Sequence, residues 1–272
     1  MLRRWQDDVN GDPLPWLLAD ENPSARYLTL RHLLHGDERD TQTAEARAAI
    51  QTWAPVDELL SLMDPISFWG RAEKPFYGGA MSTHATLHLL AELGLPRLEQ
   101  LTPACESLLT HGQHESGGFS YDGVEERILL CHTGNAIRTL VHFGYRDDAR
   151  VQRAFQYLVA RSSPPSGLTC PYVDGEVCQW GITKALGAFA ALPRDQRTPE
   201  QAEAIALLAD AVLDFPFDFE ERHADWLAFG FPLDYQSDLT ELCNILARLD
   251  YGPDPRFERL LAVMMAAQSE HG

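Results

Sequence analysis

Residues 131–137 read CHTGNAI, and two similar stretches lie 50 residues before and after them, MSTHATL at 81–87 and GITKAL at 181–186. Each stretch opens an apolar segment with helical periodicity and places a threonine near its start, at Thr83, Thr133 and Thr183. Self-similarity at a fixed period of this length is typical of proteins that stack one helical unit repeatedly. The sequence therefore predicts an all-α fold in which a helical hairpin recurs.

Four helix pairs are expected on this basis, over about 81–94 with 98–111, 132–144 with 147–161, 178–192 with 198–213, and 238–249 with 254–268. Residues that end helices, mainly glycine and proline, separate the two members of each pair. An earlier helix is expected to begin at Asn22-Pro23-Ser24 and to end at Gly36, with a partner over Thr43 to Trp53.

The repeated helices carry few charges, whereas their partners, such as 148–161, have charged outer faces. The simplest packing places the first set inside and the second set outside. If every hairpin turns the same way, the result is a curved solenoid or a closed ring with a central cavity, bordered by the N-terminal ends of the inner helices. Functional residues are expected there.

Composition narrows the classes of partner. The chain has 272 residues, 45% of them hydrophobic, which can fill one substantial core or two modest ones. Its 40 Asp and Glu against 22 Lys and Arg give a net charge of −18, which repels nucleic acid and anionic lipid. No run approaches the roughly 20 apolar residues of a membrane span, and residues 1–8 lack the apolar region of a secretory signal. We therefore expect a cytoplasmic protein with no nucleic-acid partner.

The loops before the repeated helices combine glycine with aromatic residues, as in SGGFSY at 116–121. A Gly-Gly-Phe turn leading into an inner helix resembles the prenyltransferase and squalene-oxidase repeat of the α/α-toroid proteins, over roughly residues 60–272. Segments 22–27, 131–135, 178–186 and 229–238 look like those of uncharacterised bacterial prenyltransferase-like proteins. The resemblance implies one α/α-toroid domain of five or six hairpins, with an N-terminal hairpin over 1–60 and a repeat region over 61–272.

Two motifs of terpene cyclases and synthases are absent from the sequence, the Asp-x-Asp-Asp acid and the Asp-Asp-x-x-Asp magnesium site. The nearest approximation to the first is Asp218-Phe219-Glu220-Glu221, an acidic run of a kind that is more often a solvated loop. A diphosphate substrate would also need clustered Arg or Lys, of which the chain has few. Standard terpene-synthase chemistry is therefore not predicted.

Three cysteines, Cys131, Cys170 and Cys178, fall in loops or first turns at the expected mouth of the ring, and His223 follows in the next inter-helix loop. Thiolate and imidazole ligands suit zinc, so these four residues are a candidate metal site. The alternatives are buried reduced thiols with a surface histidine, or a Cys170–Cys178 disulfide. The other two cysteines, at positions 105 and 243, are expected to be small core residues.

Protein prenyltransferases bind catalytic zinc through Asp, Cys and His near the starts of inner helices, so the resemblance adds Asp238, which begins the last inner helix. His132 and His84 also begin inner helices, where the helix dipole favours a neutral imidazole that acts as a base. His132 and Asp238 are thus the candidate catalytic residues, although histidines in such positions often only hydrogen-bond a neighbour.

Aromatic residues concentrate in or beside the loops at the expected mouth. Together with His84 they are candidates to bind a substrate in an apolar pocket, although the same rings could simply cap the core. The candidates are Trp69, Tyr77, Phe119, Tyr121, Tyr172, Trp180, Trp226 and Tyr235, with Phe229 and Phe231 nearby.

These observations lead to two functional expectations. The first is a metal-assisted transferase or cyclase that acts on an isoprenoid or similarly apolar small molecule, with zinc as Lewis acid or thiolate activator. The alternative is a non-catalytic toroid that binds a hydrophobic ligand or a partner peptide, with structural zinc or none. The sequence indicates neither the substrate nor the oligomeric state.

Overall fold

A computed structural model of the chain describes residues 8–66, 68–122, 124–163 and 165–269. The segment 1–7, on which the expectation about a leader partly rests, lies outside these ranges. The described part of the chain is helical and contains no β-strand, only isolated bridges such as that between Gln113 and Phe119. The predicted all-α class is confirmed.

The α-helices occur in the order α1 (Leu14–Leu17), α2 (Pro23–Leu28), α3 (Thr41–Ile50), α4 (Ala54–Ser61), α5 (Thr83–Glu92), α6 (Thr102–Ser107), α7 (Leu130–His142), α8 (Ala149–Ser162), α9 (Gln179–Ala190), α10 (Pro199–Leu213), α11 (Leu239–Arg248) and α12 (Pro255–Ala266). Single π turns continue α2 over Thr29–Leu33 and α6 over Leu108–Gly112. Short 3-10 turns lie at Gly79–Met81, Glu99–Leu101, Glu125–Arg127, Pro165–Leu168, Pro171–Val173, Arg194–Gln196 and Ala224–Leu227.

The four predicted pairs correspond to α5 with α6, α7 with α8, α9 with α10, and α11 with α12. The predicted start of α2 is also confirmed, because the Asn22 side chain accepts a hydrogen bond of 3.0 Å from the amide of Ala25 and caps the helix. Helix α4 was not predicted. Its eight residues are too few to establish a periodicity in the sequence.

The helices form two layers. Helices α5, α7, α9 and α11 pack against one another in that order, and α8 and α10 pack outside α7 and α9. Helix α2 joins the end of α5, where the Ser24 hydroxyl donates to the carbonyl of Leu93 at 2.7 Å. The two ends of the chain also meet, since the amide of Asn10 donates to the Gln268 side chain at 3.1 Å and its side chain donates to the carbonyl of Ser269 at 2.7 Å.

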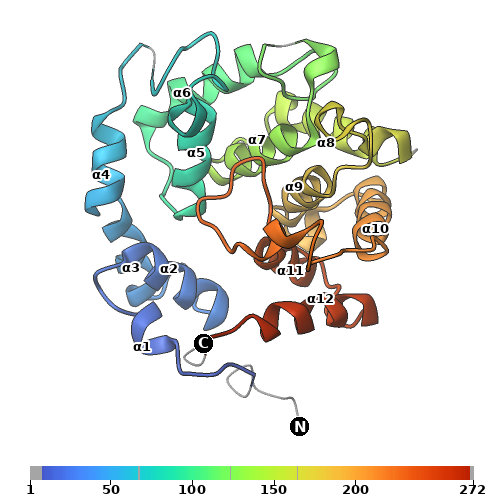
Figure 1. Cartoon of the computed structure of the whole chain (residues 1–272). Helices are drawn as coiled ribbons and strands as arrows, with labels where there is room; N and C mark the ends of the chain where they lie inside the picture. The colour runs from blue at the N-terminus through green and yellow to red at the C-terminus, as the bar shows by residue number, and fades with distance from the viewer. Residues whose placement is uncertain (1–7, 67, 123, 164, 270–272) are drawn as a thin grey trace.

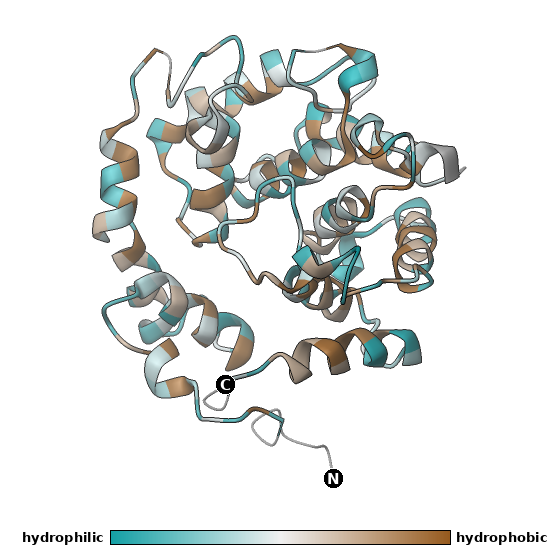
Figure 2. Cartoon of the chain, in the orientation of Figure 1, coloured by the Kyte–Doolittle hydropathy of each residue, from teal (hydrophilic) through white to brown (hydrophobic). Residues whose placement is uncertain are grey.

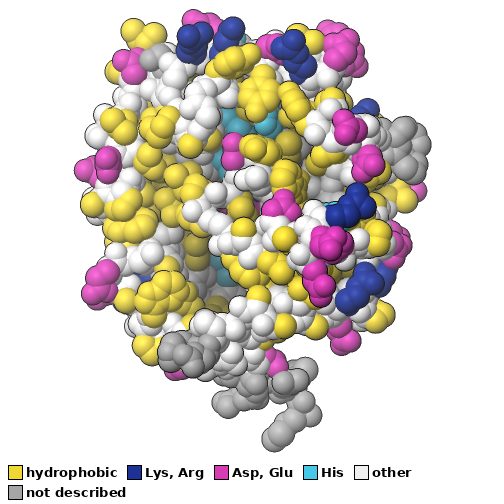
Figure 3. All heavy atoms as spheres, viewed as in Figure 1, with side chains coloured by type: hydrophobic (Ala, Val, Ile, Leu, Met, Phe, Trp, Pro, Cys, Tyr) yellow, Lys and Arg dark blue, Asp and Glu magenta, His cyan; other side chains and the backbone are white. Residues whose placement is uncertain are grey.

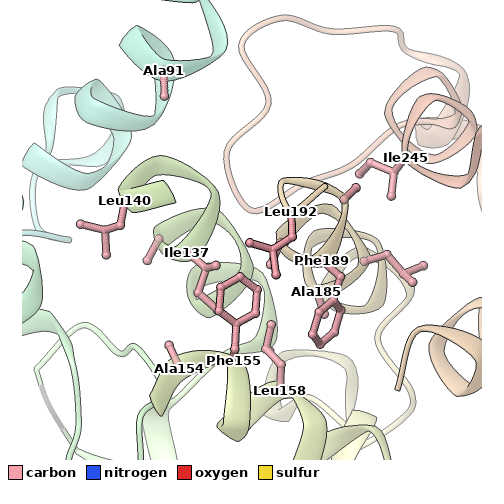
Figure 4. Close-up of a cluster of buried hydrophobic side chains, with 14 of the residues drawn as sticks. Ala91, Ile137, Leu140, Ala154, Phe155, Leu158, Ala185, Phe189, Leu192 and Ile245 are labelled. Atoms are coloured by element: carbon pink, nitrogen blue, oxygen red, sulfur yellow. The ribbon is translucent and has the colours of Figure 1, made fainter. Parts of the chain in front are cut away.

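The hydrophobic core fills the space between the layers. Figure 4 shows Ile137 of α7 and Phe155 of α8 on the side that faces Ala185 and Phe189 of α9, while Leu140 of α7 points to the opposite side. All five side chains are buried. Hydrophobic and hydrophilic residues alternate along the outer helix α4 (Figure 2), as expected for a helix with one face toward the core.

Two of the three repeated threonines and the Gly-Gly-Phe turn have a structural role, whereas the buried Thr83 hydroxyl has no hydrogen-bond partner among the described residues. The Thr133 hydroxyl donates to the carbonyl of Leu129 and accepts from the amide of Phe119, both at 2.9 Å. The Thr183 hydroxyl similarly donates to the carbonyl of Gln179 at 2.9 Å. In the repeat that contains Thr133, the loop is therefore tied to the inner helix that follows it, which holds the starts of neighbouring inner helices in place.

Candidate functional site

A loop over residues 228–237, which we call the central loop, crosses in front of the inner helices (Figure 1). It is fastened at two points. The Asn135 side chain of α7 donates to the backbone carbonyl of Asp234 at 2.7 Å, and the Ser237 hydroxyl donates to Glu241 of α11 at 2.6 Å. Beside this loop the surface is hollowed, with histidine and acidic side chains visible between hydrophobic ones (Figure 3).

Four side chains form what we call the histidine–aromatic cluster: Phe76, His84, Tyr121 and His132. The His132 ring stacks on Phe76 with a centroid distance of 4.9 Å and an interplanar angle of 4°, and it meets the Tyr121 ring edge-on at 4.5 Å. The His84 ring lies 4.3 Å from Phe76 and 5.8 Å from His132. Residues from α5, α7 and two loops are thus brought together.

Several polar atoms at this site are buried without a hydrogen-bond partner among the described residues. They include both ring nitrogens of His84, Nδ1 of His132, Oδ1 of Asn135 and Oδ1 of Asp234. A buried polar atom without a partner costs about 1–3 kcal/mol, so such atoms rarely gather by chance. Four of these five atoms belong to His84, His132 and Asn135 near the N-terminal ends of α5 and α7, and Asp234 adjoins Asn135 through its backbone carbonyl. This place is therefore a candidate binding site.

The histidines of the site are neutral at pH 7. Burial lowers the pKa of His132 to about 4. Burial, with smaller contributions from neighbouring positive groups, also holds the pKa of His84 and His88 well below the usual value. A neutral imidazole has one unprotonated nitrogen, so each ring can accept a hydrogen bond or a proton.

The neutral state of His132 predicts a pH dependence of stability. In the unfolded chain this residue takes up a proton below about pH 6.5, whereas in the folded chain it does so only near pH 4. Its contribution is therefore complete above pH 6.5 and is lost as the pH falls toward 4. When the pH falls from 7 to 5, the titration of His132 should lower the free energy of unfolding by about 2 kcal/mol, measured by urea denaturation.

The matched variant for this measurement is His132→Phe, which retains an aromatic ring against Phe76. From pH 7 to pH 5, the free energy of unfolding of this variant should fall by about 2 kcal/mol less than that of the unmodified protein. The buried His84 and His88, and Asp234 and Asp238, whose pKa values are raised by burial, are present in both proteins, so their contributions cancel. Equal losses in the two proteins would show that His132 titrates normally.

The three candidate cysteines lie close together. Cys131 is buried in the first turn of α7, and Cys178 caps α9, where its sulfur accepts from the amide of Gly181 at 3.4 Å. All three cysteines line one small cavity of about 10 Å³. Burial raises the pKa of Cys178 to about 11 and that of Cys131 further, so without a cation nearby these two thiols are protonated.

The structure places His223 in a different environment. Its Nδ1 accepts from the amide of Asp218 at 2.9 Å, and its ring packs edge-on against Phe215 and Phe217. Among the described residues, no group of three or more Cys, His, Asp or Glu side chains is arranged to hold a metal ion. Cys105 and Cys243 are buried, as expected for small core residues.

The structure places the candidate aromatic residues in three settings: beside the central site, exposed on the surface, and buried in the core. Tyr77 meets Tyr121 edge-on at 5.9 Å beside the histidine–aromatic cluster, and Trp180 meets Tyr235 of the central loop at 6.0 Å. Tyr172 is 71% exposed. The third group is buried in the hydrophobic core and consists of Trp69, Phe119 and Trp226.

Asp238 has a structural task, because its carboxylate accepts from the amide of Glu241 at 2.8 Å and caps α11. Asp234, four residues earlier, has the unpartnered carboxylate oxygen, and sequence reasoning missed it.

A buried ion network was missed as well. Glu241 of α11 pairs with Lys184 of α9 and with Arg138 of α7, both at 2.7 Å, and Arg138 also pairs with Glu92 of α5 at 2.8 Å.

Lysine in the apolar run 181–186 was the signal that could have revealed this network, since a fully buried lysine requires a partner.

None of the described helices is both long and apolar enough to cross a membrane. No family model, curated protein or solved structure was found to match the chain.

Proposed function

We propose that the chain is an α/α toroid. The support is the order of contacts, in which α5, α7, α9 and α11 pack successively and α2 adjoins α5 through Ser24. At the other side of α2, His32 lies near Arg248 of α11. Burial lowers the pKa of His32, and the positive charge of Arg248 lowers it further. The hydrogen bonds of Asn10 to Gln268 and Ser269 join the two ends of the chain. These contacts agree with a closed ring of hairpins.

Within this toroid we propose an enzyme, a transferase or cyclase acting on a small molecule with an isoprenoid-like or similarly apolar body. The observation that carries the proposal is the pair of buried, neutral histidines His84 and His132, with unpartnered ring nitrogens against the rings of Phe76 and Tyr121. The rings would hold the apolar body. The imidazoles would accept a proton from a polar group of the substrate, with His132 as general base.

The test is turnover of a panel of isoprenoid alcohols and the corresponding primary amines, followed by gas chromatography and mass spectrometry. His132→Asn should lower the rate at least about a hundredfold, because a positioned general base contributes about 10²–10⁴ to a rate. Trp16→Leu is the control, since Trp16 lies on α1 outside the candidate site, is 73% exposed and should leave the rate unchanged. A panel whose members bind with 1:1 stoichiometry but are not converted would support the non-catalytic alternative.

The cofactor we propose is zinc at Cys131, Cys170 and Cys178. The support is the type of donor, because three thiols from α7 and from the loop and cap before α9 line one cavity of about 10 Å³, and thiolates are preferred zinc ligands. The three side chains are not arranged around a common centre in the structure, so they would have to converge when the ion binds. When bound, zinc would supply a Lewis acid or hold a thiolate. The position of His223 among phenylalanine rings favours a site without it.

Elemental analysis of protein purified without added metal should find about one zinc per chain. Cys131→Ser and Cys178→Ser should each lower the metal content. The matched control Cys105→Ser alters a buried cysteine of α6 and should cost only about 1 kcal/mol of stability. Metal content near zero in the unmodified protein, with all thiols titrating, would exclude zinc and leave the acid–base proposal standing.

A further inference from the structure

The unpartnered atoms of the central site are mostly hydrogen-bond acceptors. Oδ1 of Asn135 can only accept, Oδ1 of Asp234 can only accept while its carboxylate is charged, and one of the two nitrogens of the neutral His84 ring accepts. The other His84 nitrogen and Nε1 of Trp180 are donors. His84 is 2% exposed and both its nitrogens are without a partner among the described residues. A ligand that satisfies these atoms must therefore donate several hydrogen bonds.

The charge at the site points the same way. The cations near the central loop, Lys184 and Arg138, are already paired with Glu241 and Glu92. Asp234, which is half-buried, and Asp238, which is buried, add two carboxylates in a protein that carries a net charge of −18. An anionic ligand would be repelled, whereas a cation would relieve the repulsion between these groups.

Aromatic rings complete the arrangement. The Tyr121 ring meets the His132 ring edge-on, with a centroid distance of 4.5 Å. Burial raises the pKa of Tyr121 to about 12, and the nearby Asp234 carboxyl contributes to this increase. The Trp180 ring stands 6.0 Å from Tyr235 on the same loop as Asp234. Aromatic faces beside a carboxylate attract an organic cation and also cover an apolar body.

We propose that this site takes a substrate with a primary ammonium group on an apolar body, the ammonium lying between Asp234, Asn135 and the two imidazoles. The proposal deepens the function proposed above and rests on it for the location of the site. An ammonium group supplies three N–H donors and one positive charge, which matches the acceptors and the unbalanced carboxylate of this site.

Three probes of nearly equal shape test the charge preference: cyclohexylammonium, cyclohexanol and cyclohexanecarboxylate. Binding is measured at pH 7.5 by isothermal titration calorimetry and by tryptophan fluorescence. Cyclohexylammonium should bind at least about tenfold more tightly than cyclohexanol, and the carboxylate should not bind. Asp234→Asn should remove this preference while leaving the affinity for cyclohexanol unchanged. Asp225→Asn, at an exposed aspartate of the same inter-helix segment, should change neither affinity.

Each other outcome is decisive. Equal affinities for the amine and the alcohol, or tighter binding of the carboxylate, overturn the ammonium assignment but leave an apolar substrate site intact. The same holds if Asp234→Asn keeps the preference for the amine. Absence of binding by all three probes contradicts the central site itself and therefore the proposed function as well.

Discussion

Replacing Glu241 with glutamine is expected to lower the free energy of unfolding by about 3–5 kcal/mol, because it leaves a buried charge without its partner. Glu241 is the only described carboxylate paired with Lys184, whose side chain has no exposed surface. Burial lowers the pKa of Lys184, and Glu241 only partly offsets this effect. Without Glu241, this lysine must lose its proton or draw the surrounding helices apart.

Urea denaturation measures this loss, and Glu92→Gln is the matched control. Glu92 pairs with Arg138 from a side chain that is 34% exposed, so its replacement should cost less than about 1 kcal/mol. The double variant Glu241→Leu with Lys184→Met should recover most of the stability lost in Glu241→Gln, since apolar residues of similar size can replace a buried ion pair. A cost for Glu241→Gln no larger than for Glu92→Gln would show that the network is hydrated and weak.

The same network positions the central loop. Glu241 accepts a hydrogen bond from Ser237 at 2.6 Å, three residues after Asp234, and Arg138 lies one helical turn beyond Asn135, which holds the carbonyl of Asp234. The ions thus fasten the loop that carries the proposed ammonium-binding carboxylate. Loss of Glu241 should therefore weaken ligand binding in addition to lowering stability.

Helices and their pairing could be predicted from the sequence because both depend on local patterns. The apolar period, the glycine and proline breaks and the cap at Asn22 are contained in short windows. The recurrence of Thr133 and Thr183 indicated a repeated unit, and the structure shows why, since each hydroxyl bonds to the carbonyl four residues earlier. The central loop has no such local signal, because its position depends on contacts with α7 that are distant in sequence.

The site was predictable only in part for the same reason. His84, His132 and Tyr121 were expected at the mouth of the ring, and the structure brings them together around Phe76, which the sequence did not distinguish from other core residues. Of the two neighbouring aspartates, the sequence favoured Asp238, which the structure uses as a helix cap. Which carboxylate stays unpartnered depends on tertiary hydrogen bonds, and composition or spacing cannot show it.

Gly134→Ala should destabilise the protein by about 3 kcal/mol, because it forces two helices apart in a packed core. Gly134 lies where α7 crosses α9, and a β-carbon there would stand 2.3 Å from the carbonyl oxygen of Lys184 and 2.4 Å from its carbonyl carbon. Both contacts are with backbone, which cannot turn aside. The loss, measured by thermal or urea denaturation, must exceed the gain of about 1 kcal/mol that alanine brings to a helix.

The matched control lies at the same helix contact. A β-carbon on Gly187 of α9 would meet side-chain atoms only, Cδ of Arg138 at 3.0 Å and Cδ1 of Ile245 at 3.1 Å. Side chains can yield by a few tenths of an ångström where a backbone cannot, so Gly187→Ala should cost less than Gly134→Ala. Separating α7 from α9 at Gly134 also moves the backbone of Lys184 and hence its pairing with Glu241. The cost of Gly134→Ala combined with Glu241→Gln should therefore be less than the sum of the two single costs, since both variants disrupt one interaction. Additive losses would mean that the helix contact and the ion network are independent.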